Sequence, residues 1–312
     1  MIKYIKPILV VVAVSLLSFT ACKDESTKEK PETAMRSEVI AEPKPPKKIL
    51  SEDFKDYWYN GEAEITSYKL EQARYGEIKD GTSVLIFVTE DFLPKEQVKA
   101  NHYNASNIPV LKLNMTKNFN TGIYPYSIMQ STFFPVSNNQ HAIKISASIQ
   151  EWCGQVYTQL NNRESFEIMS HSYFEGEADN TFSLEKNWTE NELWVKLRID
   201  PKSLPVGDIT IIPSIESARL NHDELKAYKA TAILKEDSYT INYHELRRTL
   251  QIEFNSKFPY EILGWTETTT TGKGPSEKTL TTKATKLESL KTDYWNKKSN
   301  ADLSLRTDLK LQ

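Results

Sequence analysis

The sequence predicts an all-β protein: a large antiparallel sheet, arranged as a sandwich or an open barrel, with a short C-terminal helix. Apolar and polar residues alternate with a period of two in many segments, which is typical of half-buried strands. Turn-forming dipeptides separate these segments at the spacing of roughly 8 to 12 residues expected of a sandwich or barrel. Aromatic residues make up 11% of the chain, and aromatic rings pack well on a pleated surface.

The alternation is clearest in the ranges 142–150, 193–199, 238–243 and 250–255. In the second of these, Leu193, Val195 and Leu197 alternate with bulky or charged residues. Such a pattern predicts antiparallel strands with one face in contact with water.

Two runs depart from alternation. Residues 84–88 are apolar at every position, which predicts a central strand covered on both faces. The run 123–129 contains Pro125. Because proline cannot donate a hydrogen bond to a neighbouring strand, we expect this run to begin at an edge or a bulge.

Local signals place turns and one helix. Asn60-Gly61 and Asp80-Gly81 are dipeptides favoured in tight hairpins. The stretch 217–229 contains residues that a helix would accept, but Asn221-His222-Asp223-Glu224 in its middle favours a loop between two strands. Near the end of the chain, Ser299 or Asn300 can cap a short helix that runs to about Leu309, with an acidic residue in its first turn.

Residues 1–21 are expected to be a lipoprotein signal peptide. A positively charged start precedes an apolar run, and the run is shorter than the roughly 20 residues that a membrane-spanning helix needs. Phe19-Thr20-Ala21-Cys22 resembles a bacterial lipobox. We therefore expect Cys22 to carry the lipid and to become the first residue of the mature chain, with several acyl chains holding the protein to a membrane.

Residues 22–50 are predicted to be a disordered tether. The segment is rich in charge and proline and poor in apolar residues, so it cannot bury enough surface to offset the entropy of ordering. Lys23, Asp24 and Glu25 resemble the signal that directs lipoproteins of the Bacteroidetes to the outer face of the outer membrane. The expected location is the outer membrane, facing the cell exterior.

Residues 51–312 are expected to form one β-rich domain, with a possible seam near 174–181 between two β-modules. The chain has 39 Lys and Arg residues against 42 Asp and Glu, a formal net charge of −3. Because nucleic-acid binding favours a strongly basic face, no nucleic-acid partner is expected.

The sequence contains no motif for a catalytic, metal or cofactor site. His-Glu-x-x-His, Gly-x-Ser-x-Gly and phosphate-binding glycine loops are absent, so no catalytic residue, metal or cofactor is predicted. Cys153 is the only cysteine besides Cys22. One thiol cannot form an internal disulfide, and beside Trp152 we expect it to be a small buried residue.

Weaker candidates exist among the acids and the aromatic residues. Glu90-Asp91 follows a predicted strand, and Glu62 and Glu64 lie on one side of another. Either pair could act on a glycoside, although a solvated strand end or face explains both. The aromatic clusters at 57–59, 124–126, 152–157 and 294–295 could stack on sugars or apolar ligands, but packing in the core is the simpler interpretation.

Several motifs resemble those of a family of outer-membrane lipoproteins of unknown function from flavobacteria, which belong to the Bacteroidetes. They are Asp-Tyr-Trp-Tyr at 56–59, Thr-Glu-Asp-Phe-Leu-Pro at 89–94, Asn-Phe-Asn-Thr-Gly-Ile-Tyr-Pro-Tyr-Ser at 118–127 and Asp-Tyr-Trp at 293–295. Such proteins often carry the label "septum formation inhibitor Maf". The Ser-x-Ser-Pro-Arg-Arg loop of the Maf pyrophosphatases is absent, so the resemblance implies a β-rich lipoprotein and no catalytic residue.

Three functional hypotheses follow. The first is a non-enzymatic, lipid-anchored envelope protein that binds a ligand or partner: a glycan, an apolar molecule or another envelope protein. The second is a surface hydrolase acting on a glycan or another envelope polymer, and the third is a module that handles lipids or lipoproteins. The lining of the largest cavity distinguishes them, because converging carboxylates favour the hydrolase and bare aliphatic walls the lipid carrier.

Overall fold

The computed structural model describes residues 49–137 and 141–311. The predicted signal peptide, Cys22 with Lys23-Asp24-Glu25, and all but the last two residues of the tether lie outside these ranges. Most of the described chain is a single antiparallel sheet of 16 strands, which confirms the predicted all-β class.

The first half of the chain begins with a helix, α1 (Glu52–Trp58), and continues in strands. These are β1 (Ala63–Arg74), β2 (Glu77–Leu93), β3 (Val98–Lys99), β4 (Ile108–Thr121), β5 (Tyr124–Pro135), β6 (Lys144–Glu151), β7 (Gly154–Asn162), β8 (Phe166–Ser172) and β9 (Asn180–Leu184).

The second half begins at β10 (Trp188–Thr189), followed by α2 (Glu190–Ile199) and the short 3-10 helix η1 (Pro201–Ser203). The remaining elements are β11 (Gly207–Ile212), α3 (Ile215–Asn221), β12 (Tyr228–Leu234), β13 (Ser238–Tyr243), β14 (Arg248–Phe254), β15 (Ile262–Thr271), η2 (Gly274–Ser276), β16 (Lys278–Thr292), η3 (Tyr294–Asn296), η4 (Asn300–Leu303) and α4 (Ser304–Asp308).

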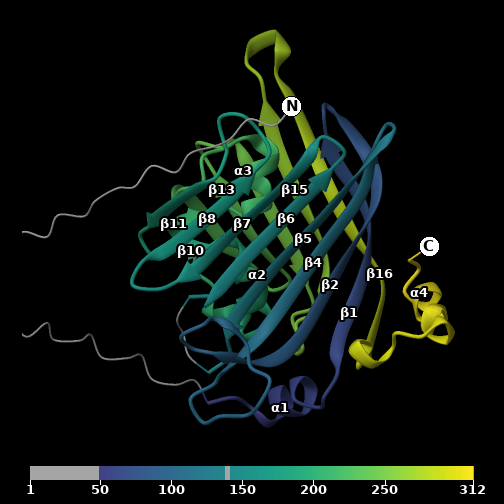
Figure 1. Ribbon diagram of the computed structural model, residues 1–312. Coiled ribbons are helices and arrows are strands. Elements are labelled where there is room, and N and C mark those ends of the chain that lie inside the picture. Colours follow the sequence, from purple (N-terminus) through teal and green to yellow (C-terminus); the bar gives the residue numbers. More distant parts are fainter. Residues whose placement is uncertain (1–48, 138–140, 312) are drawn as a thin grey trace, which may run out of the picture. The chain divides into compact units, whose positions relative to one another are not determined.

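The sheet is open. Its order is β10-β11-β12-β13-β14-β15-β16-β1-β2-β4-β5-β6-β7-β8-β9, with β3 paired to β2, and every neighbouring pair is antiparallel except β10 with β11. The sheet curves around α2 and α3, which lie on its concave side (Figure 1). In the part of the chain that the structure describes, no ladder joins β9 to β10, so the arrangement is an open barrel.

Helix α2 is the main difference from the sequence prediction, which placed a strand at 193–199. The helix crosses the interior and is buried on all sides, so Trp194, Lys196 and Arg198 are as buried as the residues between them. Because no face of α2 contacts water, its sequence lacks the polar stripe of a surface helix. The alternation of apolar and polar residues at 193–199 therefore led to the wrong prediction of a strand. The reliable signal was the capping box, in which Thr189 and Glu192 each bond to the other's backbone.

Helix α3 also replaces an expected loop, at the start of the stretch 217–229. The side chain of Ser214 accepts a hydrogen bond from Ser217 N at 3.1 Å and begins the helix. His222 ends it in the left-handed conformation, with φ of 58°. The helix is short and packs into the concave side of the sheet, so tertiary contacts stabilise it.

One predicted turn and the predicted edge position of the run 123–129 were wrong. Gly81 lies inside β2, and the turn between β1 and β2 is made by Tyr75 and Gly76, both with positive φ. Pro125 lies near the start of β5, which pairs with β4 and β6 and is therefore an inner strand. A proline at the beginning of a strand removes few ladder bonds, which explains why an inner strand tolerates it.

The central strand β2 agrees with the prediction from its continuous apolar run. Leu85 and Phe87 face the concave side and are buried, while Val84 and Ile86 on the opposite face line a groove of about 270 Å³ beneath the C-terminal segment. The C-terminal helix is confirmed as well. Ser299 forms a capping box with Asp302 at the start of η4, which runs directly into α4.

Candidate functional site

Helix α3 divides the space at one end of the curved sheet into two pockets. The smaller pocket, of about 290 Å³, lies between α3 and strands β1, β15 and β16. The larger, of about 790 Å³, lies between α3 and strands β7, β8 and β9. We call this end of the sheet the mouth. Helix α2 packs beneath the mouth, so both pockets lie above this helix.

The strand register sets the order of side chains along the wall of the smaller pocket. The cross-strand pairs, from the interior outwards, are Trp265 with Ala284, Glu267 with Thr282, Thr269 with Leu280, and Thr271 with Lys278. On β1, Gln72 donates a hydrogen bond to the hydroxyl of Thr282 at 3.1 Å and so belongs to the layer of Glu267. The wall therefore passes from an apolar layer, through a layer with a carboxylate and an amide, to a rim with a lysine.

Two oxygen atoms at the floor of this pocket have unused capacity to accept hydrogen bonds. Gln72 is 5% exposed, and its Oε1 is buried without a hydrogen-bond partner. Glu267 accepts bonds from Arg248 (2.6 Å) and Ser217 (3.3 Å), both on Oε1, and no bond to its Oε2 occurs among the described residues. A buried acceptor without a partner costs free energy.

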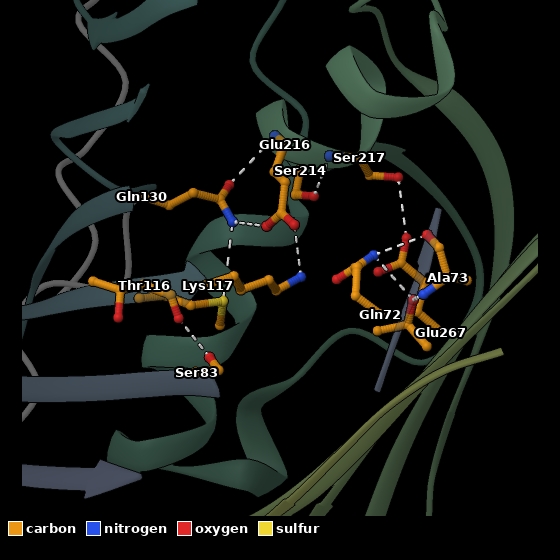
Figure 2. A network of polar contacts seen from close by, with 12 residues as sticks. Gln72, Ala73, Ser83, Thr116, Lys117, Gln130, Ser214, Glu216, Ser217 and Glu267 are labelled. Atoms are coloured by element: carbon orange, nitrogen blue, oxygen red, sulfur yellow. Dashed lines mark hydrogen bonds and ion pairs between the residues drawn. The ribbon is translucent and has the colours of Figure 1, made fainter. Parts of the chain in front are cut away.

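Glu216 connects the pocket to a buried polar network (Figure 2). One of its oxygens accepts a bond from Lys117 at 2.7 Å, and the other accepts one from Gln130 at 2.7 Å. Both side chains of the Lys117–Glu216 pair are 5% exposed. Behind the network lies a cavity of only about 20 Å³, which Lys117, Glu216 and Glu267 also line.

The pKa values of the two acids that line this pocket, Glu216 and Glu267, are shifted in opposite directions. Burial raises the pKa of Glu216, and the nearby carboxylate of Glu267 adds to this, so the attraction of Lys117 is outweighed. Burial would also raise the pKa of Glu267, but the charges of Arg248 and Lys117 outweigh it and hold the pKa at about 2. Lys117 lies near two carboxylates, which raise its pKa although burial opposes them.

Arg248 links the network to the first turn of α2. Its guanidinium donates two bonds to Glu190, at 2.6 and 2.8 Å, besides the bond to Glu267. The hydroxyl of Tyr243 donates to the same Glu190 carboxylate at 2.7 Å. All donors around Glu190 are buried, so the arrangement fixes the position of α2 below the mouth.

At the rim of the smaller pocket, Arg74 and Lys278 form no ion pair with a carboxylate among the described residues, although Glu77 lies near enough to Lys278 to be affected by its charge. Arg74 donates to the backbone oxygen of Leu220 and to the hydroxyl of Tyr126, and its guanidinium lies 4.4 Å from the ring centre of Tyr75. Lys278 is exposed and donates to the backbone oxygen of Gly76.

The larger pocket is amphipathic. Its apolar wall includes Phe182, Leu184 and Ile215. Its polar edge carries Glu177 and Arg219, which lie 3.3 Å apart, and the guanidinium of Arg219 lies 4.3 Å from the ring centre of Phe174. Glu175, Asp223 and Glu224 line this pocket too, so its polar edge is mainly acidic and its walls are not purely aliphatic.

The acids singled out in the sequence do not line these pockets, and two of them, Glu64 and Glu90, are held in ion pairs. Glu64 accepts two bonds from Arg198, at 2.6 and 2.7 Å, and a third from Tyr57. Glu90 lies 2.6 Å from Lys112, and Glu62, which is half-buried, accepts a hydrogen bond from the side chain of Asn60. Asp91 pairs with Pro109 in the β2–β4 ladder.

The histidines are dispersed, and no group of three or more His, Cys, Asp or Glu residues suited to a metal occurs in the described chain. The nearest polar partners are Glu192 for His141, Asp179 for His171, and Thr231 for His244. None of the described helices is long and apolar enough to cross a membrane.

Aromatic residues divide between core and surface. Trp58 and Tyr126 are buried, whereas Trp152 is 69% exposed. Cys153 is exposed in the turn between β6 and β7, so the expectation of a buried thiol was wrong. A two-residue turn at the end of a hairpin has no core to pack against, which explains the exposure of both residues.

Sequence reasoning missed every residue of the mouth, because the residues that form it are distant in the chain. Gln72 and Thr282 meet through the pairing of β1 with β16. The one available local signal was Ser214 followed by Glu216 and Ser217, a start of a helix.

Comparison with known proteins leaves the chain without an assigned family. No family model and no curated protein matches it. A beta-barrel-like protein of a domain of unknown function from Brucella abortus is 10% identical, with a TM-score of 0.41 and coverage of 74% of this chain and 98% of that one. A porin-like protein from Bacteroides uniformis is 7% identical, with a TM-score of 0.22 and coverage of 73% and 96%. At these values neither similarity bears on function, and the fold is defined by the strand pairing itself.

Proposed function

We propose that this protein is a lipid-anchored protein of the bacterial cell envelope that binds an amphipathic ligand in the mouth of its curved sheet. The observation that carries the proposal is the larger pocket of about 790 Å³ beside α3. Ligand pockets of roughly 300 to 1,000 Å³ with apolar walls and a few polar groups are typical of small-molecule sites. The anchor rests on the sequence around Cys22.

The lining favours a ligand with an apolar body and a polar end. Phe182, Leu184 and Ile215 offer apolar contact, and burying apolar surface contributes roughly 25 cal/mol per Å². Glu177 and Arg219 at the edge can bind a polar group. A ligand that was apolar throughout would displace water from this ion pair without offering it a hydrogen bond.

A fluorescent probe tests this pocket. Full-length protein in detergent is titrated with N-phenyl-1-naphthylamine, whose fluorescence rises in apolar sites, and the signal of protein-free micelles at the same detergent concentration is subtracted. Ser170→Trp fills the pocket from β8, and Met169→Trp places the same side chain on the opposite, exposed face. We expect the signal to be lost in the first variant and kept in the second. No signal in the wild type, or equal loss in both variants, contradicts the proposal.

A hydrolase is the second candidate, because Glu216 and Glu267 line one pocket and their pKa values shift in opposite directions, as for a catalytic acid and its partner. Both oxygens of Glu216 already accept hydrogen bonds, however, so proton transfer would require breaking the network. The test is release of 4-methylumbelliferone from its glycosides. If the wild type releases it and the Glu216→Gln variant does not, the hydrolase becomes the preferred function.

A further inference from the structure

The smaller pocket has a charge pattern distinct from that of the larger one. Its rim carries Arg74 and Lys278, and its floor carries the acceptors Gln72 Oε1 and Glu267 Oε2. Cations that line a pocket without carboxylate partners attract an anionic group, and a guanidinium can bind a carboxylate with two parallel bonds. The rim is therefore suited to the anionic end of a ligand.

The floor is suited to neutral donors. Glu267 already has the Arg248 guanidinium 2.6 Å away, and Lys117 lies close enough to lower its pKa further. A ligand ammonium group would be repelled by both cations. A hydroxyl donates a hydrogen bond without adding charge, and it can satisfy Gln72 Oε1 and Glu267 Oε2.

The wall between floor and rim carries a threonine in each layer, beside the apolar side chain of Leu280 in the middle layer. Thr282 and Thr271 lie in the floor and rim layers, with Thr269 between them. The floor layer and the rim layer are four residues apart along a strand, a distance of roughly 13 Å. Thr282 already accepts bonds from Gln72 and the Ala73 amide, and Thr271 donates to the Lys278 carbonyl. The Thr269 hydroxyl has no partner among the described residues, so a methylene chain would leave it unpaired, whereas a sugar hydroxyl can pair with it. Tyr75, 60% exposed at the rim, offers an aromatic face for a sugar ring.

We infer that the smaller pocket binds a short acidic carbohydrate, with its carboxylate between Arg74 and Lys278 and its hydroxyls on Gln72 and Glu267. The inference extends the proposed ligand-binding function to the other side of α3. It assigns a ligand class to a pocket that the proposed amphipathic ligand does not occupy.

Calorimetry with the full-length protein in detergent tests the inference. The probes are digalacturonate, the neutral disaccharide lactose, and 6-aminohexanoate, which has a carboxylate and an ammonium joined by methylenes. We expect digalacturonate to bind most tightly. Lys278→Gln should weaken its binding about tenfold, the effect of losing one charge-assisted hydrogen bond. Lys283→Gln is the matched control, because Lys283 is exposed on the opposite face of β16.

The outcomes separate this inference from the proposed function. Equal binding of lactose, tighter binding of 6-aminohexanoate, or an equal response of the two lysine variants would overturn the acidic carbohydrate. So would the absence of digalacturonate binding. N-phenyl-1-naphthylamine is titrated into the same samples, and if its signal persists while digalacturonate fails, the ligand-binding mouth stands and only the carbohydrate site is lost.

Discussion

Arg248 on β14 and Glu190 at the start of α2 form a buried ion pair with two parallel hydrogen bonds, of 2.6 and 2.8 Å. A second pair of the same kind, Arg198 with Glu64, joins the end of α2 to β1. The acid lies in the first turn and the arginine in the last, as the helix dipole favours. Helix α2 is thus held at both ends across the interior of the sheet.

Arg248→Met should therefore be strongly destabilising. The variant leaves the buried carboxylates of Glu190 and Glu267 without their cation, and breaking a buried pair in this way costs about 3 to 5 kcal/mol. Urea unfolding followed by tryptophan fluorescence measures the change. The control is Arg247→Met, since Arg247 forms an exposed pair with Glu277, and such pairs contribute about 1 kcal/mol or less. Similar losses in both variants would contradict the role assigned to Arg248.

The β fold was predictable from the sequence because most strands have one face in contact with water. Polar residues on that face alternate with apolar residues on the other, and this alternation indicates a strand. Helix α2 was not predictable in the same way, since Trp194, Lys196 and Arg198 are buried among apolar neighbours. The mouth was hidden for another reason. Gln72 and Glu267 meet through strand pairings between distant parts of the chain, and no local pattern encodes that meeting.

Lys117→Met tests the network below the mouth. Without the ammonium, Glu216 and Glu267 are left as neighbouring buried carboxylates, and we expect a loss of about 3 to 5 kcal/mol in the free energy of unfolding at pH 7. Adding Glu216→Gln removes one of the two charges. The double variant should therefore recover at least about 1 kcal/mol relative to Lys117→Met, because residues in one network are not additive. Simple additivity of the two changes would disprove the coupling.

The same variant has a predictable pH dependence. Burial raises the pKa of Glu216 in the folded protein, and loss of Lys117 should raise it further. Between the ordinary pKa of a glutamate and this raised value, the folded state binds more protons than the unfolded state, so stability falls as pH rises. The loss caused by Lys117→Met should be smaller at pH 5 than at pH 8. A loss that grew on acidification would have the wrong sign.

Glu267 should contribute to acid sensitivity in the opposite sense. Its pKa is about 2 in the folded protein against an ordinary value of 4.5, so the unfolded state binds more protons between these values. The stabilisation, about 3 kcal/mol at most, is complete above pH 4.5 and is lost as the pH falls towards 2. The Glu267→Gln variant lacks this stabilisation at every pH. The difference between the urea midpoints of wild type and variant should therefore shrink as the pH is lowered towards 2. Glu277→Gln, at an exposed carboxylate, is the control.

The lipid anchor is testable through the two cysteines of the chain. Cys22 lies outside the described residues, and its role follows from the lipobox-like sequence before it. Several acyl chains on one residue give nearly permanent membrane binding. Cys22→Ala should therefore abolish metabolic labelling with an alkyne fatty acid and move the protein from the membrane fraction to the soluble fraction. Cys153→Ala is the matched control, because Cys153 is exposed in a hairpin turn of the folded sheet, and it should keep both properties. Membrane retention of the Cys22 variant would show that the anchor lies elsewhere.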